Sequence, residues 1–352
     1  MDTIVQEDIN WLIANLDYKK FEGCKILITG ANGSIARYLV YFFMNISCVQ
    51  HMDCHVYALV RDQGKSKALF GEWLDTPFFH LQVGDVIKGI DFVKDMTYIF
   101  HAAGISKTKL FSTNPVEVIA SNVEGTYNLL DNLKGASQLR KFVFFSSGAV
   151  YGDPQSDNLP LDENMYYPFS LLNTNACYVE GKRMGEVWCN TYWKQYKIPT
   201  VVARIGHTYG PGIDLESGHV FSDFVNCILN RQNIDIKNPQ VMRPFTYVRD
   251  LVQGILILAL AGNCGEAYNI WNEKANISVG DLAHVLVGDV FRERQLKVYY
   301  QNREYLHRAD NNSSKRLMQD TLKMQKLGWN AIVDVREGFA RTVRSFEERN
   351  VH

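Results

Sequence analysis

A buried strand, a glycine turn and a helix follow one another near the start of the chain, and this order restricts the fold more than any other feature. Lys25-Ile-Leu-Ile-Thr29 has the composition of a buried strand, Gly30-Ala-Asn-Gly33 that of a turn, and residues 34–45 that of a helix. Gly30 can adopt a backbone angle that a Cβ disfavours, and Gly33 lets backbone N–H groups approach a pyrophosphate at the helix N-terminus. Ala36 stands where a third glycine often packs helix against strand. The segment therefore predicts a dinucleotide-binding unit.

Short apolar segments alternate with helical ones as far as residue 205. Such alternation predicts an α/β fold of the Rossmann type, with a doubly wound parallel sheet covered on both faces. The expected strands are 25–29, 55–60, 80–83, 98–102, 141–146 and 200–205, and the longer expected helices are 115–133 and 178–196.

Beyond residue 206 the alternation of short strands and helices stops, and loops rich in Gly, Pro and Asn connect helices such as 250–260 and 279–287. We expect a smaller C-terminal substrate-binding lobe on the carboxyl side of the strands, where ligands of such sheets bind. The predicted domains are an N-terminal helical extension (1–22), a Rossmann domain (23–205) and a mainly substrate-binding lobe (206–352) interleaved with it. In the extension, apolar residues at helical spacing fit two interpretations, packing on its own domain or a subunit interface. They are Ile9, Leu12, Ile13 and Leu16.

The charge and cysteine content exclude several classes of protein. The formal net charge is -1 with no basic stripe, which argues against nucleic acid as a partner. The nine histidines show no metal-ligand spacing, so we expect no metal. The seven cysteines form no CxxC pair and several lie in apolar stretches, as free thiols of a reducing compartment do. With no visible signal peptide, and only a short apolar run at 255–261, we expect a cytoplasmic protein without membrane contact.

The end of the second strand is expected to select the cofactor. An acid there binds the 2′-hydroxyl of NAD, whereas an arginine accommodates the 2′-phosphate of NADP. Arg61 follows the strand directly, which favours NADP, although Asp62 could serve as the acid and Arg61 could be merely solvated. After the third strand, Asp85 could hydrogen-bond the adenine or cap a turn.

Three residues have the chemistry of an alcohol-oxidising site. Tyr178 and Lys182 are spaced i and i+4, on one face of a helix. A close ammonium favours the phenolate and lowers the pKa of a tyrosine from its usual value of about 10. Ser147, just past a strand, could hydrogen-bond a substrate alcohol while Tyr178 removes its proton and the cofactor takes the hydride.

Taken together, these motifs resemble the extended short-chain dehydrogenases of the NAD-dependent epimerase/dehydratase family, and within it most resemble UDP-glucuronate decarboxylases and related capsule-pathway enzymes. The resemblance covers nearly the whole chain, with the motifs in the expected order. They are Thr29-Gly-Ala-Asn-Gly33, Gly84-Asp-Val86, His101-Ala-Ala-Gly104, Asn122 with Gly125-Thr126, Ser146-Ser147 with Val150-Tyr-Gly152, Tyr178-Val-Glu-Gly-Lys182-Arg183, Ala203-Arg-Ile-Gly-His-Thr-Tyr-Gly-Pro211, Arg243-Pro-Phe-Thr-Tyr-Val248 and Leu327-Gly-Trp329.

The resemblance implies site residues of three kinds. The catalytic set is Ser147, Tyr178 and Lys182. The set expected around NAD or NADP is Gly30, Asn32, Gly33, Ser34, Ile35, Arg61, Asp85, Val86, Ala102, Ala103, Gly104, Asn122, Tyr178, Lys182 and Ile205. The set expected around a nucleotide sugar or nucleotide polyol is Ser106, Lys107, Ser147, Gly148, Ala149, His207, Val220, Phe221, Phe224, Arg243 and Tyr247, with Arg243 able to meet the phosphates.

Two departures from the family pattern bear on the reaction. Sugar 4,6-dehydratases of the family carry an Asp-Glu pair after the catalytic Ser or Thr, for proton transfer at C5 and C6, and the decarboxylases carry a Glu at the second of these positions. Here the two positions are Gly148 and Ala149, which cannot transfer a proton. His207 also replaces an Asn that commonly contacts the sugar or the diphosphate.

What remains is the redox chemistry, and we expect a nucleotide-sugar epimerase working through transient oxidation, in surface-polysaccharide precursor synthesis. A net dehydrogenase or ketosugar reductase needs the same residues and is the main alternative, ahead of a decarboxylase or dehydratase. A nucleotide-binding structural or regulatory protein is the alternative from another class. Family members often pair through a four-helix interface, so the resemblance also implies a homodimer through helices 115–133 and 178–196.

Overall fold

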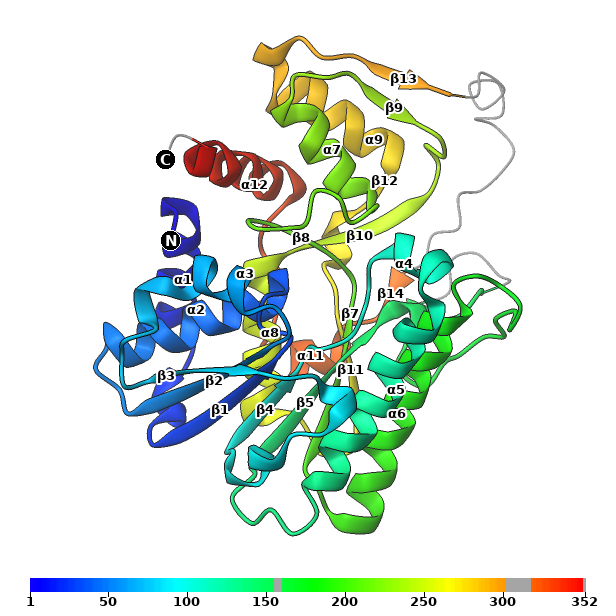
Figure 1. Ribbon diagram of the computed structural model, residues 1–352. Coiled ribbons are helices and arrows are strands. Elements are labelled where there is room, and N and C mark those ends of the chain that lie inside the picture. The colour runs from blue at the N-terminus through cyan, green and yellow to red at the C-terminus, as the bar shows by residue number, and fades with distance from the viewer. Residues whose placement is uncertain (155–159, 302–317, 351–352) are drawn as a thin grey trace.

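The computed structural model describes residues 1–154, 160–301 and 318–350. Its centre is a seven-stranded parallel sheet in the order β11-β7-β5-β4-β1-β2-β3, which confirms the predicted Rossmann-type α/β fold (Figure 1). The reversal of strand order lies between β1 and β4, which pair from Ile26 with Tyr98 to Thr29 with His101. The strands are β1 (Cys24–Thr29), β2 (Cys54–Val60), β3 (Phe79–Val83), β4 (Tyr98–His101), β5 (Lys141–Ser147), β7 (Thr200–Ile205) and β11 (Ala267–Ile270).

Alternating side chains of these strands enter two hydrophobic cores, one on each face of the sheet. On β1, Ile26 and Ile28 belong to the core under α2 (Ser34–Cys48) and α8 (Val248–Ala261), whereas Leu27 belongs to the other core. That second core lies under α5 (Pro115–Asn132) and α6 (Ala176–Tyr196). Because both faces are covered, the central strands are mostly apolar, as their sequences predicted.

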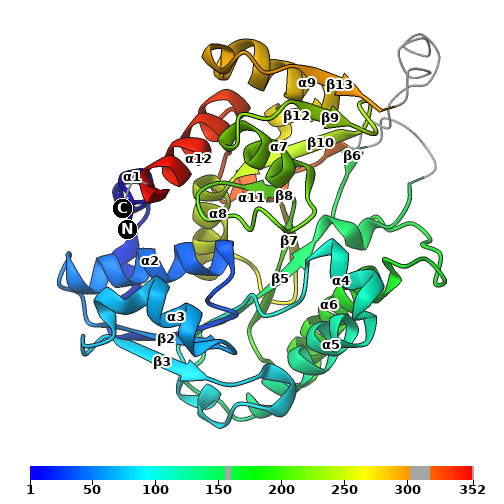
Figure 2. The ribbon, with the colours of Figure 1, turned by 45° about the horizontal axis from the view of Figure 1, so that its top comes forward.

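The remaining elements form a smaller lobe beyond the carboxyl ends of the strands (Figures 1 and 2). It contains a three-stranded sheet, β12-β10-β8, and a pair of short strands, β9 and β13. Its chain is interleaved with the larger domain, because α8 and β11 follow residue 206 yet belong to the central sheet and its cover. The bounds are β8 (His207–Tyr209), α7 (Val220–Leu229), β9 (Ile234–Ile236), β10 (Met242–Tyr247), β12 (Asn276–Ser278), α9 (Val279–Val285) and β13 (Val298–Tyr300).

Shorter elements complete the chain. A two-stranded pair joins β6 to β14, and α11 packs beside β11. Among the described residues no helix is both long and apolar enough to cross a membrane. The bounds are α3 (Gln63–Phe70), α4 (Thr108–Thr113), β6 (Pro160–Leu161), β14 (Met318–Gln319) and α11 (Leu322–Lys326).

The N-terminal helix α1 (Thr3–Ala14) packs on its own chain, against α2, α8 and the C-terminal helix α12 (Val335–Asn350). Asp8 on α1 is fully buried and accepts hydrogen bonds from Tyr38 of α2 (3.1 Å) and Tyr247 of β10 (2.7 Å). Arg341 of α12 donates to the same carboxylate at 2.8 Å. One carboxylate thus ties α1 to the central domain, to the lobe and to α12, and the two terminal helices α1 and α12 lie side by side (Figure 1).

Candidate active site

The crevice between the carboxyl ends of β1 and β4 is shaped by Gly30. Its φ of +65° is left-handed, and a Cβ there would come within 3.0 Å of the Cα and N atoms of Ala103. Gly33, the residue before α2, closes the turn by donating to the carbonyl of Gly30 at 2.8 Å. The first N–H groups of α2, from Ser34 and Ile35, therefore start at this turn, where the helix N-terminus favours an anion. The structure thus brings Gly30, Gly33, Ser34 and Ala103 to one place, as predicted.

A buried chain of hydrogen bonds holds the two sides of this crevice together. His101 at the end of β4 is 1% exposed, and its Nδ1 and Nε2 lie 2.9 Å from Thr29 Oγ1 and 3.1 Å from Thr126 Oγ1. Thr29 Oγ1 also accepts from the backbone N of Ala103 at 3.0 Å. Burial lowers the pKa of His101 to about 3, and the charge of Lys182 adds to this, so the ring is neutral.

Gly104 opens a space between Asn122 and Lys182. A Cβ on Gly104 would lie 2.6 Å from Asn122 Oδ1 and 3.1 Å from Lys182 Nζ. Asn122 is buried, and although its Nδ2 donates to the Val118 carbonyl at 2.8 Å, its Oδ1 has no hydrogen-bond partner in the described structure. A buried acceptor without a partner is costly, so a donor from a bound group is expected here. The predicted residues Gly104, Asn122 and Lys182 therefore form one cradle.

Tyr178 and Ser147 hydrogen-bond to each other through their side chains. Ser147 is the last residue of β5, and its Oγ also accepts from the backbone N of Ala149 at 3.2 Å. The ring of Tyr178 stacks on Phe111 of α4, with centroids 4.9 Å apart and planes 16° apart. The stacking and the influence of Ser147 on the Tyr178 pKa place the two predicted catalytic side chains near each other.

The charge of Lys182 is not among the influences that shift the pKa of Tyr178, which differs from the sequence expectation. The Nζ of Lys182 lies 5.9 Å from the centroid of the Tyr178 ring and donates to the Phe145 carbonyl at 2.7 Å. Burial raises the pKa of Tyr178 and the hydrogen bond from Ser147 lowers it, with a net increase. Burial also lowers the pKa of Lys182 to about 8, although the charge of Glu186 one turn along α6 opposes this. Desolvation thus dominates both residues, because the site is enclosed on the side of β5.

The small sheet of the lobe carries two of the predicted substrate residues, His207 and Arg243. His207 on β8 pairs in register with Phe245 on β10, so His207 and Arg243, two residues before Phe245, lie on the same face of this small sheet. Burial, Arg243 and His219 together lower the pKa of His207 to about 3. Burial also lowers the pKa of Arg243. The guanidinium of Arg243 and the neutral ring of His207 are both half-buried and could donate hydrogen bonds to a diphosphate.

The other predicted substrate residues occupy different environments. Ser106 and Lys107 are exposed, and Lys107 forms an ion pair with Asp214 on the facing loop of the lobe. Val220 begins α7, and its neighbours Phe221 and Phe224 are buried in the core of the lobe. Tyr247 lies apart from the site, fully buried with its hydroxyl on Asp8. Gly148, Ala149 and Ile205 follow or end the strands β5 and β7 at the carboxyl edge of the sheet.

The residues expected to select the cofactor lie at the ends of β2 and β3. Arg61 is exposed directly after β2, while the carboxylate of Asp62 caps α3 by accepting from the backbone N of Lys65 at 3.0 Å. Asn32 donates to the Asp62 carbonyl at 3.1 Å, which joins the glycine turn to this segment. Asp85 caps the turn that contains Val86, accepting from the backbone N of Ile87 at 3.0 Å. The preference for NADP that Arg61 indicated stays a prediction.

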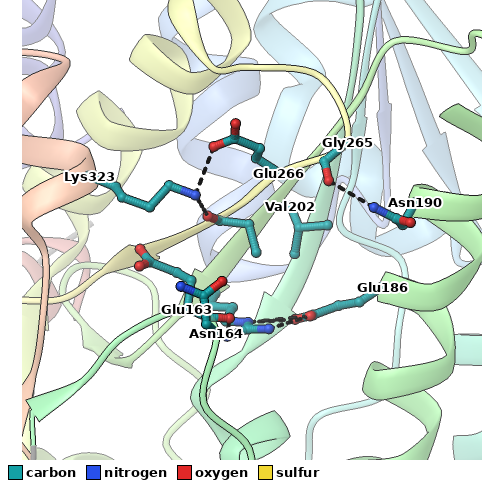
Figure 3. A pocket seen from close by; sticks show the side chains of 10 residues that line it. Glu163, Asn164, Glu186, Asn190, Val202, Gly265, Glu266 and Lys323 are labelled. Carbon is teal, nitrogen blue, oxygen red and sulfur yellow. Dashed lines mark hydrogen bonds and ion pairs between the residues drawn. The ribbon is translucent and has the colours of Figure 1, made fainter. Parts of the chain in front are cut away.

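A separate cavity of about 560 Å³ lies against the middle of β7, among β11, α6 and α11 (Figure 3). Charged side chains that line the cavity pair with one another: Glu186 binds Arg204 at 2.7 Å and Lys323 binds Glu266 at 2.8 Å. Neither Ser147 nor Tyr178 lines this cavity, although Arg204 in its lining pairs in register with Ser146. Within residues 1–154, 160–301 and 318–350 no group of His, Cys, Asp and Glu could hold a metal ion.

Sequence reasoning missed three residues of this region. His101 was noted only as part of a motif, although a histidine ending a buried strand beside two threonines could have indicated the hydrogen-bonded chain. His219 lies near His207 only because α7 folds back over β8. Trp271 ends beside Ser147 only because β11 joins the sheet next to β7, and no local signal indicates this.

Comparison with known proteins identifies the family of this chain. Residues 26–271 match the model of the "NAD dependent epimerase/dehydratase family". UDP-glucuronic acid decarboxylase 1 of Xenopus tropicalis is 27% identical over 331 residues, covering 93% of this chain and 73% of that protein. UDP-glucuronic acid decarboxylase 6 of Arabidopsis thaliana is 28% identical over 326 residues, covering 92% and 89%.

Solved structures share the fold at lower identity. UDP-glucuronic acid 4-epimerase from Bacillus cereus, in complex with UDP-glucuronic acid and NAD, is 21% identical with a TM-score of 0.74, covering 93% of this chain and 100% of that chain. UDP-N-acetylglucosamine 4-epimerase from Methanobrevibacter ruminantium M1 is 20% identical with a TM-score of 0.78, covering 93% and 99%.

Proposed function

The chain belongs to the NAD dependent epimerase/dehydratase family, and from this premise we propose that it is a nucleotide-sugar epimerase that oxidises a sugar hydroxyl transiently. One observation carries the proposal. Ser147 acts on the pKa of Tyr178 as a hydrogen-bond partner and Lys182 lies beside the Tyr178 ring, which supports proton transfer from an alcohol during its oxidation by the cofactor, whereas the next two positions hold Gly148 and Ala149. Redox steps are therefore supported, and proton transfer by those two side chains is not.

The dinucleotide fits the crevice between β1 and β4. Gly30 keeps the turn open, and the free N–H groups at the start of α2 suit its pyrophosphate. The unpartnered Oδ1 of Asn122, beside the space left by Gly104, offers an acceptor to its ribose or carboxamide side. When bound there, NAD supplies the site that accepts a hydride and later returns it.

Side chains of the protein transfer the proton and orient the substrate. The Oγ of Ser147 holds the reacting hydroxyl, and the Oη of Tyr178 takes its proton. Lys182, whose pKa burial lowers to about 8, lies 5.9 Å from the centroid of the Tyr178 ring, and its role in the proposal is to approach the hydroxyl and favour the phenolate once cofactor and substrate are bound. Return of the proton by Tyr178 to the same oxygen, after the sugar has presented its other face, completes the epimerisation. The nucleotide end of the substrate is held by Arg243 and His207.

The test is turnover of UDP-sugars by the wild type and by Tyr178→Phe, with products separated by chromatography and reduced nicotinamide followed by absorbance. We expect conversion between epimers without net growth of reduced nicotinamide. We expect Tyr178→Phe to lower kcat at least about 100-fold, with NAD affinity nearly unchanged. Tyr299→Phe, an exposed tyrosine of the lobe, is the matched control and should retain turnover.

The same assay separates the other candidate reactions. Stoichiometric growth of reduced nicotinamide would replace the epimerase proposal by a net dehydrogenase. The relatives named as UDP-glucuronic acid decarboxylases are the specific reason to include UDP-glucuronate and to measure carbon dioxide. Its release at the rate of turnover would show that Gly148 and Ala149 do not exclude decarboxylation.

We also propose a homodimer formed through α5 and α6. These neighbouring helices carry exposed apolar side chains, namely Val116, Ile119, Tyr127, Met184 and Val187. Contiguous apolar side chains of this kind mark association surfaces. Sedimentation should give twice the chain mass for the wild type and a monomer for Val187→Glu, and a monomeric wild type would contradict the proposal.

A further inference from the structure

The indole of Trp271 fills the space beside Ser147 that a side chain at position 148 would take. A Cβ on Gly148 would overlap the Cη2 and Cζ2 atoms of this ring, far inside van der Waals contact distance. On the opposite edge of the ring, a Cβ on Gly206 would lie 2.9 Å from Cδ2 and 3.0 Å from Cε3. The six-membered ring of the indole therefore fits between Gly148 and Gly206, which follow the neighbouring strands β5 and β7.

The position of Trp271 explains how its ring reaches this corner. Trp271 directly follows β11, and β11, β7 and β5 are consecutive in the sheet. The side chain therefore extends across the carboxyl end of β7 to the end of β5, where Ser147 pairs in register with Ile205. Only small residues after β5 and β7 leave a path for it.

The ring is held firmly in this place. Its Nε1 donates to the carbonyl of Arg204 at 2.9 Å. The residues near it in the chain are fixed as well, because Asn269 Nδ2 donates to the Leu161 carbonyl and Asn272 Nδ2 to the Val333 carbonyl, both at 2.9 Å. Trp271 itself is 5% exposed and packs in a small core with Val150, Tyr151 and Leu161. A ring anchored at its nitrogen and on both sides cannot swing aside to admit a larger ligand.

We propose that Trp271 is a specificity-determining residue that closes the corner of the sugar subsite beside Ser147. Ser147 holds the reacting hydroxyl, so the corner next to it receives the substituent on an adjoining carbon of the sugar ring. With the indole there, the site accepts a nucleoside diphosphate pentose, which has no carbon substituent at that place, in preference to a hexose or a hexuronate. This inference rests on the proposed function for the location of the sugar.

Binding measurements test the inference without requiring turnover. The probes are UDP, UDP-xylose and UDP-glucose, titrated by calorimetry into the NAD-loaded protein. We expect the wild type to bind UDP-xylose at least about tenfold more tightly than UDP-glucose, since a rigid pocket discriminates to this extent against one extra carbon group. Trp271→Ala should reduce that ratio to about threefold or less by improving UDP-glucose binding, and should leave the affinity for UDP itself unchanged.

A control variant and a double variant show whether the change in UDP-sugar binding is specific to Trp271. Trp193→Ala removes a tryptophan that also packs on a glycine, Gly265, but near the start of β7, and it should leave the ratio unchanged. Gly148→Ala should weaken binding of both UDP-sugars by forcing the ring to move, and the Gly148→Ala/Trp271→Ala double variant should restore it. Gly148→Ala alone gives a second measurement should Trp271→Ala fold poorly, because it retains the indole.

The outcomes distinguish this inference from the epimerase proposal. Equal wild-type affinities for the two UDP-sugars, or an unchanged ratio in folded Trp271→Ala, would overturn it whatever the reaction is. The expected binding pattern in a protein that epimerises none of the sugars would support the inference and overturn the epimerase. Failure to bind any UDP-sugar would overturn both.

Discussion

Replacing His101 by glutamine tests whether the buried hydrogen-bonded chain at the cofactor crevice depends on a neutral imidazole. His101 is 1% exposed, and both ring nitrogens face threonine hydroxyls, Thr29 at 2.9 Å and Thr126 at 3.1 Å. A glutamine keeps a polar side chain in this place and cannot titrate. The variant thereby removes the proton equilibrium while leaving part of the hydrogen bonding.

The expected change in the free energy of unfolding follows from the pKa values of His101 in the folded and unfolded states. Burial lowers the folded-state pKa from 6.5 to about 3, so the folded protein disfavours the charged form. The stability that this provides is complete above the unfolded-state pKa and is lost as the pH falls towards the folded-state pKa. Each pH unit between the two values removes about 1.4 kcal/mol. Lowering the pH from 6.5 to 5 should therefore cost the wild type about 2 kcal/mol through this residue alone.

The assay is urea unfolding followed by tryptophan fluorescence at about pH 8 and about pH 5, for the wild type and His101→Gln. The stability of the wild type should fall by about 2 kcal/mol more than that of the variant across this interval. Any constant loss caused by the substitution cancels in this difference of differences. Equal falls for the two proteins would show that the imidazole accepts a proton in the folded state, and the argument from burial would be refuted.

Three further changes have defined outcomes. Gly30→Ala places a Cβ 3.0 Å from the backbone of Ala103 at a positive φ, so it should cost about 1–2 kcal/mol of stability and weaken NAD binding, measured by fluorescence titration. Arg61→Ala should weaken NADP binding about tenfold and spare NAD if Arg61 meets a 2′-phosphate, and equal loss of both would exclude that role. Asp8→Ala leaves Arg341 without its buried partner and should lower the free energy of unfolding by about 3–5 kcal/mol, whereas a loss below about 1 kcal/mol would contradict this.

Local patterns in the sequence were sufficient for the order of the elements and for the placement of Tyr178 and Lys182 on one helix. Strand, glycine turn and helix at 25–45 depend only on composition and on the freedom of Gly30, and the structure reproduces them. The i, i+4 spacing places Tyr178 and Lys182 on one face of α6 because helix geometry is fixed by the backbone. What that spacing could not give was the direction of the ammonium group, which points to the Phe145 carbonyl.

Tertiary structure alone decided the contacts between distant segments. Trp271 reaches Ser147 across three strand ends, and Asp8 joins helices from both ends of the chain. Tyr247 was expected at the substrate, yet β10 directs its hydroxyl to Asp8. Periodicity records which face of an element is buried, but strand order in the sheet determines which buried faces meet. For that reason the chain's sequence specified the chemistry of its site, and the packing of β11 beside β7 specified the shape around it.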